Sequence, residues 1–228
     1  MIKSETLISA LVRESDAEVM ASEARLGVAD GADAVMFDLS EIAPESRTEE
    51  TCRKLVLSVA VPAMFCCYDL SAQDSLPQID EPMLAAARVG AAYVDVSPSA
   101  VPDAKKADAK VILSEHLLSR SAPFDEAMKI FRRQRDAGAD VAKLVARMDT
   151  PDEFAEAKRV MAHLRDEFDL PWIYLGLGTF GFEQRFLGPE YGAAMTFALH
   201  RPFPGKKDQP LITDFTAGRG KEGIADNV

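Results

Sequence analysis

The sequence predicts a single-domain α/β fold, the (β/α)8 or TIM barrel, on three observations. Eight short apolar, β-prone runs recur along the 228 residues. Most of these runs are separated by stretches with helical period, which calls for a parallel sheet with crossover helices. Eight such units in roughly 200 to 250 residues are what a barrel of this kind needs. The first run leads into "VRESDAE" without a glycine, whereas an open doubly wound sheet more often carries a glycine-rich phosphate turn there.

The expected strands follow one another at regular intervals. Two intervening stretches carry clear helix signals. Residues 125–138 alternate apolar and charged positions and end at Gly138, which suits a C-cap, and residues 149–168 open with a cap residue and Pro151 in the first turn. We expect the barrel to occupy residues 1–210 and a polar tail to occupy 211–228. The expected strands are residues 6–12, 32–40, 61–69, 91–99, 110–116, 141–148, 172–178 and 193–200.

Charge and hydropathy exclude several classes of function. A net charge of −11 and a pI near 4.8 argue against binding of nucleic acid or of an anionic membrane surface. A small anionic substrate remains possible if cations gather locally. The chain has no apolar run of about 18 residues. Acidic residues appear near its start, before an apolar stretch long enough for a signal peptide. We therefore expect a cytoplasmic protein without a membrane segment.

Three cysteines, Cys52, Cys66 and Cys67, give an odd number, and the last two are neighbours whose side chains would point to opposite faces of a strand. A disulfide framework is therefore not expected. Structural zinc is not expected either, because no Cys or His lies at the paired spacings of such sites. We interpret the three as core residues in a reducing compartment.

Barrel enzymes carry their chemistry where inward-pointing side chains meet at the C-terminal ends of the strands. Since side chains alternate along a strand, Lys143 and Arg147 share one face of residues 141–148. Asp38 shares a face with Ala34, Met36 and Ser40, and His116 shares one with Ile112 and Ser114. If these faces point inward, the mouth of the barrel collects Lys143, Arg147, Asp38 and His116.

Lys143 and His116 together suggest imine chemistry. A lysine in an apolar pocket beside another cation has its ammonium form disfavoured, which frees the amine to attack a carbonyl. The imidazole of His116 is then the natural proton carrier, because a histidine ordinarily has a pKa of about 6.5. The alternatives are an edge or snorkelling lysine and a histidine satisfied in the core. For Asp38 the alternative is a structural ion pair with Arg147.

With these residues in view, the chain resembles the type I 3-dehydroquinate dehydratase family from about residue 5 to residue 206. "GADVAKLVARM" (138–148) is similar to the family's "GADivKiA" strand, which implies that Lys143 is the Schiff-base lysine. "ILSEH" (112–116) is similar to its "iiSyH" motif, which implies that His116 is the general acid/base. "LGTFGFEQRFLGPEYGAAMTF" (177–197) is similar to "MGxxGxxSRxxgxxfGSxxtf", and this resemblance implies that Arg185 binds the substrate carboxylate.

The chain departs from the family at positions around the substrate. The second-strand "ExR" becomes Met36 and Asp38, and the fourth-strand "DxE" becomes Asp95 and Ser97. The third-strand arginine becomes Tyr68, and the following "EGG", whose carboxylate assists the histidine, becomes "DLSAQDS". The resemblance thus implies a set of substrate-binding residues that includes Tyr68, Asp38, Arg147 and Lys206. Arg147 replaces an apolar residue of the family, and Lys206 in "FPGK" replaces a glutamine. Asp38 is also a candidate to orient His116.

The resemblance implies a Schiff-base lyase without metal or organic cofactor. It would dehydrate 3-dehydroquinate to 3-dehydroshikimate in the shikimate pathway, or act on a related anionic β-hydroxy ketone, as a possible homodimer. One rival is a class I aldolase-like enzyme on another ketoacid. A second is a metal-dependent barrel of the citrate-lyase type, suggested by "DGADAVMFDLSEIAPES" (30–46). The non-enzyme rival is a ligand-binding barrel that has lost its substrate shell.

Overall fold

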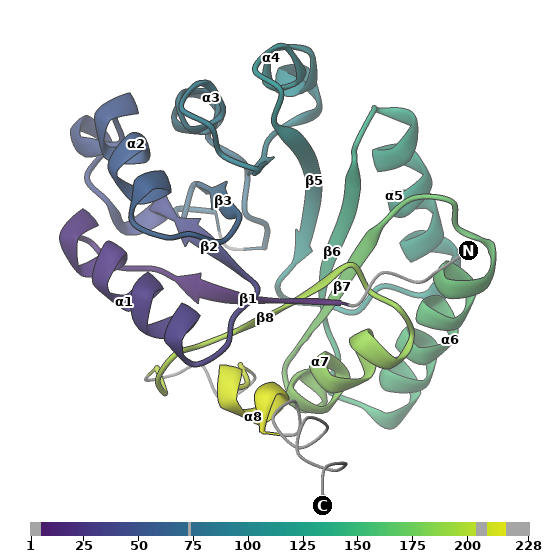
Figure 1. Cartoon of the computed structure of the whole chain (residues 1–228). Helices are drawn as coiled ribbons and strands as arrows, with labels where there is room; N and C mark the ends of the chain where they lie inside the picture. The colour runs from purple at the N-terminus through teal and green to yellow at the C-terminus, as the bar shows by residue number, and fades with distance from the viewer. Residues whose placement is uncertain (1–5, 73, 204–208, 218–228) are drawn as a thin grey trace, which may run out of the picture.

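The computed structural model describes residues 6–72, 74–203 and 209–217. Each of the eight predicted runs contains a strand, and helices lie outside the strands (Figure 1). The strands are β1 Leu7–Val12, β2 Ala34–Asp38, β3 Ala63–Cys66, β4 Tyr93–Asp95, β5 Lys110–Leu117, β6 Val141–Arg147, β7 Trp172–Leu177 and β8 Met195–Ala198. The α-helices are α1 Ala17–Ala29, α2 Glu49–Leu57, α3 Asp80–Arg88, α4 Val101–Lys106, α5 Phe124–Asp136, α6 Pro151–Glu167, α7 Gly181–Glu190 and α8 Ile212–Thr216, with short 3-10 turns η1 Leu39–Glu41, η2 Pro44–Ser46 and η3 Pro98–Ala100.

All pairs of neighbouring strands are parallel, in the order β7-β6-β5-β4-β3-β2-β1-β8. The two ends of this order meet, because the backbone N–H of Ala194, just before β8, donates to the carbonyl of Trp172 at 2.8 Å. The strands therefore form a nearly closed ring, as the sequence predicts for a (β/α)8 barrel.

Side chains alternate between the barrel interior and the layer under the helices. An interior cluster contains Met36 of β2, Ile112 of β5 and Val141 and Val145 of β6, and two larger clusters fill the space between strands and helices. The inward faces predicted for β2, β5 and β6 are confirmed at Ala34, Met36, Ile112, Val141 and Val145. Because the register pairs Ser114 of β5 with Lys143 of β6, the polar positions of these strands lie at one level.

Local signals explain two of the helices. Helix α5 ends just before Gly138, whose φ of 91° lies in the left-handed region that glycine tolerates. Helix α6 begins at Pro151 after Thr150, which accepts a hydrogen bond from the backbone N–H of Glu153, while the Glu153 side chain caps the Thr150 backbone. This capping box satisfies two N–H groups that a helix end leaves free.

The predicted polar tail begins too early. Residues 211–217 pack on the barrel, since Ile212 of α8 is fully buried and its N–H donates to the Leu199 carbonyl at 2.9 Å. The apolar "PLI" at 210–212 supplies the contact that overrides the polar composition of the segment. Residues 218–228 lie outside the described part of the chain.

The three cysteines are free and buried, as the sequence predicts. Burial raises the pKa of the Cys67 thiol to about 11 and of the Cys52 thiol to about 12. Within the described residues no helix has the length and apolar character needed to span a membrane.

Candidate active site

Lys143 lies inside the barrel and faces a cavity of about 230 Å³ at the C-terminal ends of the strands. Its side chain is 7% exposed, and Nζ lies 3.1 Å from Oδ2 of Asp95 and 2.9 Å from the hydroxyl of Tyr68. The sequence argument expected a cation beside the amine. The structure instead gives Lys143 an acidic partner, so a buried ion pair compensates its charge.

Asp95, at the end of β4, is the centre of a buried hydrogen-bond network. Its Oδ2 accepts a bond of 2.7 Å from the Tyr68 hydroxyl, and its Oδ1 accepts bonds of 2.7 Å from Ser114 and 3.4 Å from the Gln78 amide. Sequence reasoning noted Asp95 only as a retained family residue and missed Gln78. The signal for Asp95 was available, because an ionisable residue in an apolar strand is the same feature that selected Lys143.

His116 of β5 faces the same cavity and is buried. Its ring meets the edge of the Tyr68 ring, with centroids 4.8 Å apart. Burial, with smaller contributions from the positive charges of Lys143 and Arg13, lowers the pKa of His116 well below its usual value. The imidazole is therefore neutral near pH 7, and among the described residues its Nδ1 has no hydrogen-bond partner. A neutral imidazole facing a cavity is equipped to accept a proton.

Tyr68 joins these groups into one cluster. Its hydroxyl contacts both Lys143 and Asp95, while its backbone N–H donates to the Ser40 hydroxyl at 2.9 Å. Burial and the neighbouring Asp95 charge raise the pKa of Tyr68 well above its usual value, which keeps the phenol protonated.

Asp38 lies in the cavity wall, but it pairs with Arg13, not with Arg147. Arg13 Nε donates to Asp38 Oδ2 at 2.7 Å, and Ser40 donates to Asp38 Oδ1 through its backbone N–H at 3.0 Å. The alternative of an Asp38–Arg147 ion pair is wrong. Arg13 was missed because it lies one residue past the first predicted strand, although it continues the inward face of Leu11.

Arg147, the last residue of β6, does not line the cavity. Its side chain is 44% exposed and its Nε pairs with Asp149 Oδ2 at 2.6 Å. The inward direction expected for Arg147 is therefore wrong, because its guanidinium pairs with Asp149 outside the cavity lining. Lys206 lies outside the described residues.

Arg185 reaches the cavity from α7, where it is almost fully buried. Its neighbour Gln184 fastens this helix to β7: the side-chain amide donates to the Tyr174 carbonyl at 2.7 Å and accepts from the Gly176 N–H at 2.6 Å. A Cβ at Gly176 would lie 3.0 Å from Gly181 of α7, so glycine permits this close approach.

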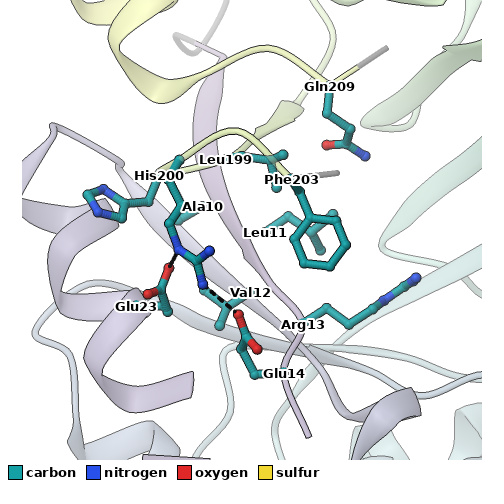
Figure 2. A pocket seen from close by; sticks show the side chains of 11 residues that line it. Ala10, Leu11, Val12, Arg13, Glu14, Glu23, Leu199, His200, Phe203 and Gln209 are labelled. Atoms are coloured by element: carbon teal, nitrogen blue, oxygen red, sulfur yellow. Dashed lines mark hydrogen bonds and ion pairs between the residues drawn. The ribbon is translucent and has the colours of Figure 1, made fainter. Parts of the chain in front are cut away.

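A second, smaller cavity of about 80 Å³ lies beside β1 and the segment after β8 (Figure 2). It shares Leu11, Arg13 and Gln209 with the larger one. Arg201 lines it and pairs with Glu14 at 3.0 Å and with Glu23 at 2.9 Å. Across the described residues, no group of three or more His, Cys, Asp or Glu side chains is arranged to hold a metal ion.

The larger cavity thus brings together an amine, a neutral imidazole, a phenol and two guanidinium groups, from Lys143, His116, Tyr68, Arg13 and Arg185. An amine beside a proton acceptor can form an imine with a ketone, and a guanidinium can bind a carboxylate. This arrangement suits chemistry on an anionic carbonyl compound.

Comparison with known proteins points the same way. Residues 8–210 match the family described as Type I 3-dehydroquinase. A 3-dehydroquinate dehydratase from Aromatoleum aromaticum is 27% identical over 124 residues, 50% of this chain and 48% of that protein. One from Alkaliphilus oremlandii is 34% identical over 98 residues, 42% of this chain and 38% of that protein. The matches span less than half the length of these curated relatives.

Solved structures agree over nearly the whole chain. The 3-dehydroquinate dehydratase from Geobacillus kaustophilus superposes with a TM-score of 0.80 at 18% identity, over 94% of this chain and 92% of that one. The type I enzyme from Clostridium difficile, solved with covalently modified comenic acid, gives a TM-score of 0.81 at 15% identity, over 94% and 91% of the two chains. At these identities the likeness establishes the fold.

Proposed function

This chain belongs to the type I 3-dehydroquinase family, and on that premise we propose that it is a carbon–oxygen lyase that dehydrates an anionic β-hydroxy ketone through a lysine imine. 3-Dehydroquinate is the first substrate to test. The observation that carries the proposal is the position of Lys143, whose amine faces a cavity together with His116 and Arg185.

The reaction begins with release of the amine. Lys143 transfers a proton to Asp95, which lies 3.1 Å away, with the Tyr68 hydroxyl bridging the two groups. The free nitrogen adds to the ketone carbon, and the carbinolamine then loses its oxygen as water. The resulting iminium withdraws electrons from the adjacent C–H bond and makes it acidic.

His116 carries the proton in the elimination. Its neutral imidazole takes the proton from the carbon next to the iminium, which leaves an enamine. The enamine expels the β-hydroxyl, to which His116 returns the proton, so that it departs as water. Hydrolysis of the conjugated imine releases the enone and restores Lys143. Arg185 is positioned to hold the substrate carboxylate throughout.

The test is reductive trapping. Incubation with 3-dehydroquinate and borohydride is expected to add the mass of one reduced substrate-derived imine at Lys143, and incubation without borohydride to release the enone. Lys143→Met should abolish both signals, whereas the exposed Lys129 can be changed to Met as a control without effect. An adduct on another lysine, or no adduct and no enone, would contradict the proposal.

Product analysis separates the dehydratase from the aldolase-like rival, because both form the imine but only the dehydratase yields an enone of unchanged carbon number. The homodimer and the cytoplasmic location stay predictions, which size-exclusion chromatography with light scattering and cell fractionation would check.

A further inference from the structure

The hydrogen-bond acceptors around the larger cavity are largely committed to the protein itself. Asp38 Oδ2 accepts two bonds from the Arg13 guanidinium, and Oδ1 accepts from both the backbone N–H and the hydroxyl of Ser40. A carboxylate offers about four acceptor positions. Asp38 therefore has no position left for a substrate hydroxyl and serves to fix Arg13.

Asp95 is committed in the same way. Its Oδ2 is shared by Tyr68 and Lys143, and its Oδ1 by Ser114 and Gln78. The Tyr68 hydroxyl in turn donates to Asp95 and accepts from Lys143. Asp38, which lines the cavity, and Asp95, which contacts the lining residues Tyr68 and Lys143, thus bond mainly to other groups of the protein.

Few acceptors remain for a bound molecule. Among the described side chains that line the cavity, two buried acceptor atoms have no partner, His116 Nδ1 and Gln209 Oε1. The imidazole is required for proton transfer. Gln209 then supplies a neutral side-chain acceptor in this described lining for an additional hydroxyl.

Much of the rest of the wall is apolar. Six leucines from strands and loops, together with Met36 of β2, line the cavity between the polar groups; the leucines are Leu11, Leu70, Leu76, Leu118, Leu175 and Leu177. Such a surface favours methylene groups over hydroxyls, because a hydroxyl placed against it loses its bonds to water without replacement. Each hydroxyl left without an acceptor is expected to lower affinity roughly tenfold.

We propose that this cavity selects an anionic β-hydroxy ketone whose other carbons carry no hydroxyls. The inference rests on the imine chemistry proposed above and narrows its substrate class. A guanidinium binds the carboxylate, and the ketone carbon lies next to the Lys143 amine. His116 donates a proton to the leaving hydroxyl. The remaining ring or chain carbons lie against leucine side chains.

The decisive comparison uses two compounds with the same ring, carboxylate, ketone and leaving hydroxyl. One is 3-dehydroquinate, and the other is 1-hydroxy-3-oxocyclohexane-1-carboxylate, which lacks its vicinal diol. We expect kcat/KM for enone formation to be at least about tenfold higher for the compound without the diol. An equal or higher kcat/KM for 3-dehydroquinate would overturn the inference.

A matched pair of variants removes any difference in intrinsic reactivity between the compounds. Met36→Gln places an acceptor in the apolar wall at nearly constant volume, and Met36→Leu keeps the wall aliphatic. Met36→Gln should move the ratio of the two kcat/KM values several-fold toward 3-dehydroquinate, and Met36→Leu should leave it unchanged. An equal shift in both variants would contradict the proposed role of the wall.

Borohydride trapping separates failure of this inference from failure of the proposed function. Adducts at Lys143 together with a preference for 3-dehydroquinate would overturn the inference and leave the imine chemistry intact. No adduct with either compound would overturn the imine chemistry and this inference with it.

Discussion

The ammonium nitrogen of Lys143 lies 3.1 Å from a carboxylate oxygen of Asp95, and both side chains are buried inside the barrel. Removing one member of a buried ion pair leaves an uncompensated charge, which costs about 3 to 5 kcal/mol. Removing both members avoids that cost. The same ion pair therefore contributes to the free energy of unfolding of the barrel and holds the amine proposed to form the imine.

This coupling predicts a non-additive double-mutant cycle. Lys143→Met and Asp95→Asn should each lower the free energy of unfolding by about 3 kcal/mol, and the double variant should lose less than the sum by at least about 1 kcal/mol. Urea denaturation of the four proteins measures the cycle. Additive losses would show that the two groups do not interact.

Tyr68 predicts a separate effect on the rate of imine formation. Tyr68→Phe keeps the ring that meets His116 but removes the hydroxyl that contacts Lys143 and Asp95. We expect borohydride trapping in a single turnover to slow by about tenfold to a hundredfold, because proton transfer from the lysine loses its bridge. The pH dependence set by His116 should not move.

The control for this variant is Tyr93→Phe, at the start of β4 and away from the cavity lining. It removes a phenol hydroxyl from the same barrel and should leave the trapping rate unchanged. If Tyr68→Phe traps substrate at the wild-type rate, the hydroxyl has no part in releasing the amine.

His116 predicts how stability responds to acid. Its pKa is lowered in the folded protein, chiefly by burial, from an unfolded value of about 6.5. Below that value the unfolded chain binds a proton that the folded protein does not, so stability falls as the pH drops from about 6.5 toward the folded pKa. Between pH 7.5 and 5.5 this one group removes about 1 kcal/mol.

The measurement is the difference between wild type and His116→Asn in urea denaturation at the two pH values. Subtraction cancels the other titrating groups, and the variant should lose about 1 kcal/mol less on acidification. Equal losses in the two proteins would mean that His116 is protonated as easily in the barrel as in the unfolded chain. The same lowered pKa should preserve the proposed dehydratase activity below pH 6.5, because the imidazole stays neutral.

The alternation of side chains along strands was sufficient to place three groups of the cavity. Asp38, His116 and Lys143 all line the cavity, and their inward direction was predicted correctly from the period of two along their strands. Arg147 was predicted by the same rule and lies outside the cavity lining, because its side chain forms an ion pair with Asp149.

Partners could not be predicted in this way. The sequence contains several candidate cations for Asp38, and nothing in the spacing selects Arg13 of the neighbouring strand over Arg147. Likewise the ion pair of Lys143 with Asp95 joins residues 48 positions apart, on β6 and β4. Such pairs depend on the register and curvature of the whole barrel, which local patterns do not specify.

The hydrogen bonds of Gln184 lead us to predict that binding of the substrate carboxylate depends on the attachment of α7 to β7. Its amide bonds to Tyr174 and Gly176 of β7 at 2.7 and 2.6 Å and so fixes the position of the next residue, Arg185. Gln184→Leu would leave a buried carbonyl and a buried N–H without partners, which costs about 1 to 3 kcal/mol for each group. With α7 loosened, KM should rise about tenfold while kcat changes less than threefold, since uniform binding is lost without altering the imine chemistry.

A general loss of stability must be separated from this local effect. Thr150→Ala removes the N-cap of α6, which costs about 1 kcal/mol, and that helix does not carry a residue of the cavity. It should lower the urea midpoint without raising KM. Steady-state kinetics of both variants at a temperature where both stay folded gives the answer. A Gln184→Leu enzyme with lowered stability and wild-type KM would show that Arg185 keeps its place without the bonds to β7, and the carboxylate contact would then depend on packing of α7 alone.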